Sequence, residues 1–299
     1  MSLLVVGSIA FDSIETPGGS VEEALGGSGT YFSYAASFFA QPRLVGVVGR
    51  DFPDEYRRVL ESRRIDLSGL ETQDGQTFRW KGRYHRDMNT RDTLELHLNV
   101  FGTFEPKLPP AYRDSTHVFL ANGSPVLKGR VLDQIKRPKL VMADTMDFWI
   151  ETQRDELMAL LPRLDGLLLN DSEARLLTEL DNLVQAGEAI RRMGPKFVII
   201  KKGEDGAMLF SHDGVFVVPA YPTPDVVDPT GAGDSFAGGV LGYLESDDSP
   251  PPGRLRRGMA FGTVVASLTV EDFGLARLQK TNRAEIDARL EQYRAMLSF

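Results

Sequence analysis

A regular alternation of short apolar runs and helix-like segments constrains the fold of this chain most strongly. The predicted strands of this part are residues 117–121, 140–143, 166–169 and 196–201. The predicted helices between them are residues 125–136, 150–161 and 172–180. Continuous apolar runs of this length are typical of strands buried on both faces, and strands that alternate with helices form parallel sheets. The sequence therefore predicts an α/β fold with a mostly parallel sheet.

The flanking parts of the chain extend this pattern. Before residue 117, the predicted elements are strands at 3–9 and 43–48 and helices at 28–41 and 53–63. After residue 201, they are a hairpin at 206–220, a glycine-rich turn at 228–234, a helix that ends near residue 245, a loop at 247–253 and two closing helices. We expect one large α/β domain, because 299 residues suffice for a full hydrophobic core.

Residues 93–100 differ from the rest, because polar and apolar side chains alternate there. Leu94, Leu96, Leu98 and Val100 share one face, which predicts a half-buried antiparallel strand. Residues 77–85 are its expected partner. Together they indicate a small sheet outside the main core.

Composition excludes several classes of protein. No stretch approaches 18 apolar residues, so we expect no membrane span, and the N-terminus lacks the basic segment of a signal peptide. The chain has no cysteine, which excludes disulfides and thiol catalysis and predicts a cytoplasmic location. The net charge of −8 argues against a nucleic-acid partner.

The segment from Asp228 to Ser235, read DPTGAGDS, carries the most chemical information. Small residues at Gly231, Ala232 and Gly233 let the backbone approach a ligand, and the N–H groups of a helix start favour an anion. Asp234 in the first turn is placed to take a proton from a hydroxyl that attacks a phosphate. The alternative is a tight turn with an ordinary N-terminal cap.

Three other polar turns also follow or precede predicted strands. Asn170 and Glu173 lie three residues apart at a helix start, which suits hydrated Mg²⁺ but equally a capping box. Residues 201–206 could contact a nucleotide or form only a hairpin turn. Asp12, Gly26 and Gly27 lie between the first strand and the first helix. Ligands of open α/β sheets bind at the carboxyl ends of strands, so these turns together favour a two-substrate crevice.

Two short motifs match other enzyme classes by chance. Asp272-Phe273-Gly274 copies a protein-kinase metal loop, but the required lysine would have to precede it in a different order. Residues 233–237 resemble a nucleophile elbow, although a Pro-Thr-Gly turn separates them from any strand. Neither a dinucleotide fingerprint nor a Gly-Lys pair of a phosphate loop is present.

The combined motifs resemble the ribokinase-like (PfkB) carbohydrate kinases. Four segments carry this resemblance, and they occur in the same order as in that family. They are Gly26-Gly27 before a helix, Asn170-x-x-Glu173, residues 201–206 and the DPTGAGD of residues 228–234. The resemblance implies a three-layer sandwich with a mostly parallel central sheet and a β lid. It places the lid at residues 11–24 and 72–102, and the main kinase domain at 1–10, 25–71 and 103–299.

The resemblance also implies the chemistry and the roles of the residues. It implies ATP-dependent transfer of a phosphoryl group to a hydroxyl, with Asp234 as general base beside an anion hole. The implied acceptor-site residues are Asp12, Gly26, Gly27, Tyr31 and Asn122. The implied ATP-site residues are Asn170, Lys201, Gly203, Gly206 and Thr230. Asn170 and Glu173 would serve Mg²⁺, in part through water, and Asp228 with residues 269–274 would serve K⁺.

Two departures from the family pattern concern the acceptor. Tyr31 stands where the family often has asparagine, and Ser28 stands where it often has lysine or asparagine. We therefore expect a sugar kinase whose acceptor the motifs do not identify. A nucleoside kinase and a non-catalytic sugar- or nucleotide-binding regulator are the alternatives. Lid strands with exposed edges could pair two subunits into a homodimer.

Overall fold

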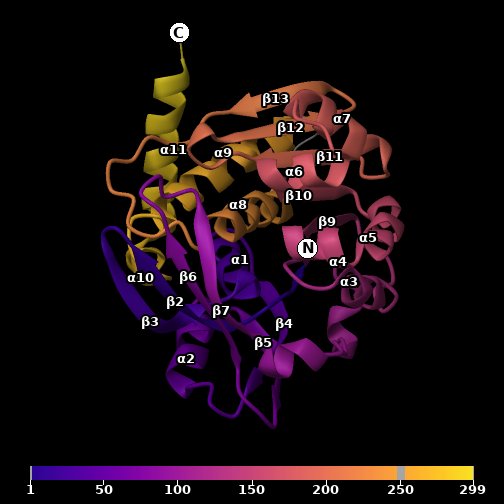
Figure 1. The fold of residues 1–299 in the computed structure, drawn as a ribbon, viewed down its shortest axis with the longest axis vertical. Coiled ribbons are helices and arrows are strands. Elements are labelled where there is room, and N and C mark those ends of the chain that lie inside the picture. The colour runs from indigo at the N-terminus through magenta and orange to yellow at the C-terminus, as the bar shows by residue number, and fades with distance from the viewer. Residues whose placement is uncertain (1, 248–252, 299) are drawn as a thin grey trace.

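The computed structural model describes residues 2–247 and 253–298 and contains two sheets flanked by helices (Figure 1). The main sheet has the strand order β13-β12-β11-β10-β9-β8-β1-β4-β5. Its strands are β1 (Leu3–Val6), β4 (Pro42–Gly49), β5 (Asp66–Gln73), β8 (His117–Leu120), β9 (Leu140–Asp144), β10 (Gly166–Asn170), β11 (Phe197–Lys201), β12 (Ala207–Ser211) and β13 (Gly214–Val218). Only β12 and β13 run antiparallel to their neighbours. The mostly parallel sheet is thus confirmed.

Helices cover both faces of this sheet, because successive side chains of its buried strands point to opposite sides. Leu3 and Val5 of β1 pack on one side, and Leu4 and Val6 pack on the other. The first side holds α1 (Ser28–Ala36), α2 (Asp54–Ser62), α8 (Ala232–Ser246), α9 (Gly253–Thr269), α10 (Ala276–Lys280) and α11 (Arg283–Leu297). The second side holds α3 (Pro125–Leu132), α4 (Asp147–Thr152), α5 (Arg154–Leu160), α6 (Asp171–Thr178) and α7 (Leu183–Arg192). This is the expected three-layer sandwich.

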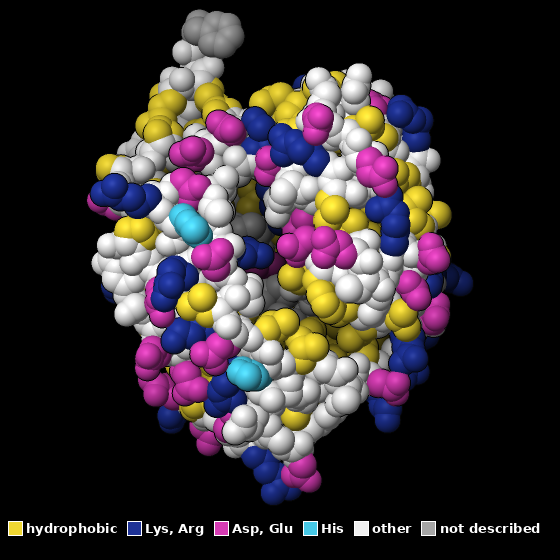
Figure 2. Space-filling model, in the orientation of Figure 1, with side chains coloured by type: hydrophobic (Ala, Val, Ile, Leu, Met, Phe, Trp, Pro, Cys, Tyr) yellow, Lys and Arg dark blue, Asp and Glu magenta, His cyan; other side chains and the backbone are white. Residues whose placement is uncertain are grey.

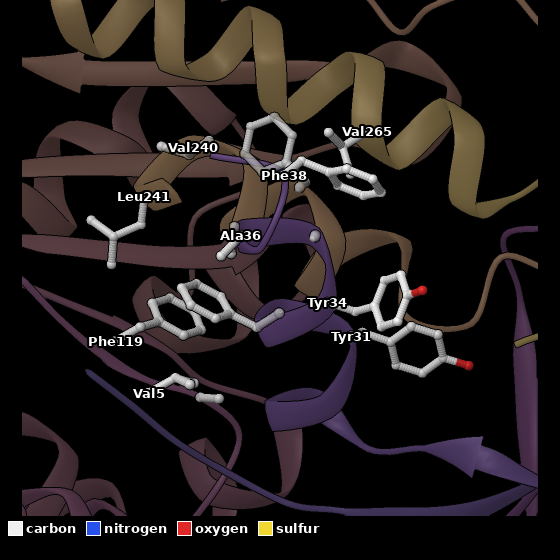
Figure 3. Close-up of a cluster of buried hydrophobic side chains, with 14 of the residues drawn as sticks. Val5, Tyr31, Tyr34, Ala36, Phe38, Phe119, Val240, Leu241 and Val265 are labelled. Atoms are coloured by element: carbon white, nitrogen blue, oxygen red, sulfur yellow. The ribbon is translucent and has the colours of Figure 1, made fainter. Parts of the chain in front are cut away.

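The core on the first side joins the sheet to helices α1, α8 and α9. Figure 3 shows Val5 and Phe119 of the sheet below α1, with Val240 and Val265 from the other two helices above it. The rings of Phe32 and Phe119 stack with centroids 4.1 Å apart. This packing fixes the start of α8, and therefore the glycine turn, relative to the strand ends.

A second sheet of four strands forms the lid, in the order β3-β2-β6-β7. Its strands are β2 (Ala10–Thr16), β3 (Gly19–Gly26), β6 (Phe78–Tyr84) and β7 (Arg91–His97). The expected pairing of residues 77–85 with 93–100 is confirmed. The prediction that this last strand is half-buried is wrong, because all seven residues of β7 are exposed at the edge of the lid.

Several other boundaries differ from the predictions. The predicted helix 150–161 is two helices, α4 and α5, because Gln153 has non-helical dihedral angles. Strand β5 and helix α7 were not predicted, and three helices rather than two close the chain. The predicted helices 28–41 and 125–136 end early, at Ala36 and Leu132. Most of the predicted loop 247–253 lies outside the described residues.

Candidate active site

A cavity of about 500 Å³ lies where the lid faces the carboxyl ends of the parallel strands. Figure 2 shows it as a hollow in the middle of one face, with basic and acidic side chains at its mouth. The sequence-predicted residues that line it are Asp12, Gly27, Tyr31, Asn122, Asn170, Glu173, Lys201, Thr230, Gly231, Gly233 and Asp234. The remaining ones, Gly26, Gly203, Gly206, Asp228 and Ala232, are not part of the lining. Residues from six separate segments thus meet at one sheet edge.

The glycine turn before α8 closes one side of the cavity. Gly231 has a φ of 74°, and a Cβ there would lie 2.3 Å from the Tyr31 ring. Glycine is therefore required both by the backbone and by the contact with Tyr31. The Ala232 N–H donates to the Pro229 carbonyl at 3.2 Å, which shapes the turn. The first-turn N–H groups of this 15-residue helix have no carbonyl partner within the helix.

Asp234 lies in that first turn, among charged groups from other segments. Removal from bulk water raises the pKa of its carboxyl to about 7, and the nearby Asp144 adds to this effect. Lys201 and Arg91 act in the opposite direction. A carboxylate with a pKa near 7 is suited to accept a proton at neutral pH.

A buried ion pair between Lys201 and Asp144 lies beside the glycine turn that precedes α8. The Lys201 ammonium lies 3.2 Å from an Asp144 carboxylate oxygen, and a Cβ on Gly233 would lie 3.0 Å from the same ammonium. Lys128, which is buried, donates to the Asp144 carbonyl at 2.5 Å. Burial lowers the pKa of Lys128 to about 8. Asp144 therefore fixes the Lys201 ammonium beside Gly233 of the predicted anion hole.

Asn170 and Glu173 form a capping box at the start of α6. The Asn170 side chain accepts from the Glu173 N–H at 2.8 Å, and the Glu173 carboxylate accepts from the Asn170 N–H at 2.7 Å. Burial, together with Asp144, raises the pKa of Glu173 to about 8. The capping box, which the sequence allowed as the alternative to a Mg²⁺ site, is therefore present. Both of its side chains also line the cavity.

The arrangement fits a magnesium ion that arrives with phosphate groups. Among the described residues, no group of three or more acidic, histidine or cysteine side chains could hold a metal alone. The crowded carboxylates of Asp144, Glu173 and Asp234 are nevertheless the oxygen donors that Mg²⁺ prefers. Mg²⁺ usually keeps several waters and takes further ligands from phosphates, so one or two of these carboxylates suffice.

Asp12 and the glycines of residues 26 and 27 form the other end of the cavity. Asp12 is only 4% exposed, and it accepts from the Gly27 N–H at 3.2 Å. Burial raises the pKa of Asp12 to about 7. A Cβ on Gly26 would lie 2.0 Å from the Asp12 carboxylate, so Gly26 supports Asp12 from behind. The Tyr31 hydroxyl nearby is buried and has no hydrogen-bond partner among the described residues.

The lid touches the body of the protein at two places. The Thr230 hydroxyl donates to the Tyr84 hydroxyl of the lid at 3.3 Å. A Cβ on Gly203, after β11, would lie 2.7 Å from the Asn89 side chain of the lid turn. The predicted nucleotide loop is thus in contact with the tip of the lid.

Asp228 joins two loops behind the glycine turn. It is fully buried, and its two carboxylate oxygens accept from the Thr230 N–H at 2.8 Å and the Gly274 N–H at 3.0 Å. Burial raises its pKa above the ordinary value. The loop at residues 269–274 therefore lies beside Asp228, as the family resemblance implied.

Among the lining residues that sequence reasoning did not assign to the site are Asp144, Trp149 and Arg91. Asp144 ends β9, next to β10, and its position directly after a predicted strand was the available signal. Trp149 of α4 donates from its indole N–H to the Asn122 side chain at 2.8 Å. Arg91 enters the cavity from the lid. No local motif marks the last two, because their partners are distant in sequence.

Comparison with known proteins identifies the family. The pfkB family carbohydrate kinase model matches residues 2–282 of this chain. The chain belongs to the pfkB family of carbohydrate kinases. It is therefore a phosphotransferase with an alcohol group as acceptor.

Individual relatives match this chain over most of their length. The chain is 29% identical to a cytidine kinase of Thermococcus kodakarensis over 251 residues, 81% of this chain and 88% of the relative. It is 29% identical to a nucleoside kinase of Methanothermobacter thermautotrophicus over 297 residues, 91% and 90% of the two chains. The crystal structure of the nucleoside kinase of Methanocaldococcus jannaschii superposes with a TM-score of 0.77 at 22% identity, covering 98% and 99% of the chains. The fold is that of the ribokinase family.

Proposed function

We propose that this chain is an ATP-dependent nucleoside kinase, which transfers the γ-phosphoryl group to a hydroxyl of the ribose. The observation that carries the acceptor class is the aromatic composition of the cavity wall, part of which lies beside Asp12. The aromatic side chains of this wall are Phe78, Trp80, Tyr84, Phe101, Phe148 and Trp149. A nucleobase stacked on such faces gains about 1–3 kcal/mol.

Two of these aromatic contacts are held in place by their neighbours. The rings of Phe78 and Phe101 stack with centroids 5.5 Å apart at an interplanar angle of 14°. The Trp149 indole is fixed by its hydrogen bond to Asn122. The curated cytidine and nucleoside kinases described above support the same acceptor class. A sugar without a base would leave this wall unused.

The polar end of the cavity supports recognition of the ribose. The Asp12 carboxylate and the unpartnered Tyr31 hydroxyl can bind sugar hydroxyl groups there. Asp234 then takes the proton as the acceptor oxygen bonds to the γ-phosphorus. The bond from that phosphorus to the β–γ bridging oxygen breaks, and ADP leaves with the electron pair. Mg²⁺ supplies charge neutralisation on the phosphates when bound, and Glu173 and Asn170 would hold it.

An ADP-release assay over a panel of acceptors tests this proposal. The panel contains cytidine, uridine, inosine, adenosine, D-ribose and D-fructose. We expect the kcat/KM of the best nucleoside to exceed that of either free sugar by at least about tenfold, because stacking contributes more than 1 kcal/mol. Trp149→Ala should lower kcat/KM for nucleosides and leave any activity on ribose unchanged.

Any other outcome of the ADP-release assay would indicate a different function. A preference for a free sugar would replace the nucleoside acceptor by the sugar acceptor that the motifs also allow. Binding of ATP and nucleoside without ADP release would indicate a non-catalytic regulator on the same fold. The charge arrangement around Asp234 opposes the regulator, because a binding protein gains nothing from a buried proton acceptor.

We propose in addition that Asp228 and residues 269–274 form a monovalent-cation site. Support comes from the contact of the buried Asp228 carboxylate with this loop. Activity should rise when K⁺ replaces tetramethylammonium at constant ionic strength, and the rise should be absent in Asp228→Asn. Equal activity in both salts would contradict the site.

Two broader properties are also proposals. The exposed edge strand β7, where Leu94 is 39% and Leu96 is 49% exposed, supports homodimer formation through the lid. Sedimentation of the wild type and of Leu94→Glu would test this, since the variant should be a monomer. Among the described residues, no helix is both long and apolar enough to cross a membrane. We propose a cytoplasmic location for this ATP-consuming enzyme.

A further inference from the structure

The cavity lining includes buried hydroxyl groups that have no partner among the described residues. Buried polar groups of folded proteins almost always form a hydrogen bond, because leaving one unpaired costs stability. Within residues 2–247 and 253–298, the buried hydroxyls without a partner are those of Thr30, Tyr31, Ser33, Thr145 and Ser235. Of these five residues, Tyr31 and Thr145 line the cavity. The Tyr31 hydroxyl can bind the acceptor, which leaves that of Thr145 without a function.

Thr145 lies between the acceptor half and the nucleotide half of the cavity. It directly follows β9 and is only 4% exposed. Strand β9 pairs with β8 on one side and with β10 on the other. Shortly after β8 comes Asn122, which fixes Trp149 of the aromatic wall, and β10 ends at Asn170 of the proposed ATP and magnesium site. A phosphoryl group that passes from the nucleotide to the acceptor therefore crosses this part of the sheet edge.

The backbone of Thr145 is fixed, whereas its hydroxyl is available to a ligand. The Thr145 N–H donates to one oxygen of the Asp144 carboxylate at 2.7 Å, and the other oxygen pairs with the Lys201 ammonium at 3.2 Å. The carboxylates of Asp144, Glu173 and Asp234 line the same cavity, yet the hydroxyl donates to none of them. It can therefore donate to an oxygen atom of a bound substrate.

We propose that Thr145 is a catalytic residue whose hydroxyl donates a hydrogen bond to the phosphoryl group during its transfer. Negative charge is spread over the oxygens of that group in the transition state, and donors that are already in place stabilise it most. A hydroxyl suits this acidic part of the cavity, because a second cation would pair with the carboxylates, as Lys201 does with Asp144. This inference rests on the phosphotransferase activity and not on the nucleoside as acceptor.

The unpaired hydroxyl predicts opposite effects on stability and on turnover. In the ligand-free protein it costs stability, because it has lost water and gained no partner. The phosphoryl oxygen supplies that partner only when the substrates are bound. Removal of the hydroxyl should therefore stabilise the ligand-free fold and slow the reaction. A hydroxyl with a purely structural function would show the reverse, because its removal would break a bond that holds the fold.

Thr145→Val tests this prediction, because valine has nearly the same shape and lacks the hydroxyl. We expect kcat to fall by at least about tenfold, since one donor to a reacting oxygen contributes up to about 10²–10³ in kcat. The KM values for ATP and acceptor should change less than about threefold, and the Tm of the ligand-free protein should rise. Thr145→Ser keeps the hydroxyl and loses a methyl group, so it should retain most of kcat and have a lower Tm.

Thr30→Val is the matched control, because the Thr30 hydroxyl is also buried and unpartnered but does not line the cavity. It should raise Tm and keep wild-type kcat. Normal kcat in folded Thr145→Val would overturn the proposal. A raised acceptor KM at normal kcat would also overturn it, because the hydroxyl would then bind the acceptor. A Tm of Thr145→Val below that of the wild type would overturn it as well, because the hydroxyl would then have a partner within the fold.

A binding measurement separates this proposal from the identity of the acceptor. Mg-ADP with aluminium fluoride mimics the phosphoryl group in transfer, and with the preferred acceptor present it should bind the wild type more tightly than Mg-ADP alone. Thr145→Val should lose at least about tenfold of this gain, and Thr145→Ser and Thr30→Val should keep it. If the wild type prefers a free sugar, the nucleoside proposal fails, and both comparisons are made on that sugar. Equal tightening in wild type and Thr145→Val would refute the role of Thr145 whatever the acceptor.

Discussion

At the residue scale, burial sets the chemistry of Asp234. A pKa of about 7 means that the carboxylate form, which accepts a proton, becomes the major form only above neutral pH. We predict that kcat/KM rises with pH through about 7 and then levels off. Asp234→Asn should lower kcat by about 10²–10⁴ and leave ATP affinity nearly unchanged. A pH series of both proteins checks this.

Asp54→Asn is the control for this variant, because Asp54 also lies in a first helical turn but is exposed and far from the cavity. It should have wild-type kinetics. Near-normal kcat in folded Asp234→Asn would remove Asp234 from the role of general base.

Gly231 provides a second test at this scale. Alanine there would meet the Tyr31 ring at 2.3 Å and would also have to adopt a φ of 74°. Gly214, in the β12–β13 turn, has a φ of 96° but nothing within 4 Å. Gly214→Ala should therefore cost only the backbone strain, about 1–2 kcal/mol. Gly231→Ala should be destabilised further and lose at least about tenfold in kcat. Equal effects of the two substitutions on stability and kcat would contradict the importance of the Tyr31 contact.

At the element scale, the lid connects both substrate sites. Its turn at Asn89 lies against Gly203, and its strand β6 contacts the glycine turn through Tyr84. We predict that amide hydrogen exchange in β6 and β7 slows when acceptor and nucleotide bind together. The β12–β13 hairpin, which lies outside the cavity, should be unaffected. Identical exchange of lid amides with and without substrates would show that the lid is only structural.

The elements also show what the sequence could predict. Unbroken apolar runs identified the central strands, because burial on both faces leaves no polar positions. Strand β5, read DLSGLETQ, was missed because it lies at the sheet edge and is half-exposed. The alternation in residues 93–100 indicated a strand correctly. It could not show whether anything covers the apolar face, and Leu94 is in fact exposed.

In the site, too, features that are local in the sequence could be predicted, and contacts between distant segments could not. Motifs local in sequence, such as the glycine turn and Asn170-x-x-Glu173, were identifiable because their residues meet within one helix start. Asp144 and Arg91 depend on contacts between elements far apart in the chain, so no spacing rule could assign them. The sequence motifs therefore located the cavity, whereas the charged side chains that surround Asp234 could be identified only from the fold.

At the scale of the whole molecule, the cavity concentrates acidic groups that oppose folding. Burial raises the pKa values of Asp12 and Asp234 to about 7 and that of Glu173 to about 8. In the unfolded chain these groups ionise near pH 4. Between these values the folded protein retains protons that the unfolded chain has released. The stability from these three groups is therefore present below about pH 4 and is lost as the pH rises through about 7 to 8.

We predict that the free energy of unfolding of the ligand-free protein falls between pH 5.5 and pH 8, as measured by denaturant titration. Asp234→Asn removes one of the three carboxyl groups, so its gain in stability over the wild type should be larger at pH 8 than at pH 5.5 and should vanish below about pH 4. Asp54→Asn should show no such pH-dependent difference. A variant less stable than the wild type at pH 8 would mean that attraction by Lys201 and Arg91 exceeds the cost of burial. A gain in stability together with a loss of turnover would instead show that this fold retains a destabilising carboxylate because the reaction requires it.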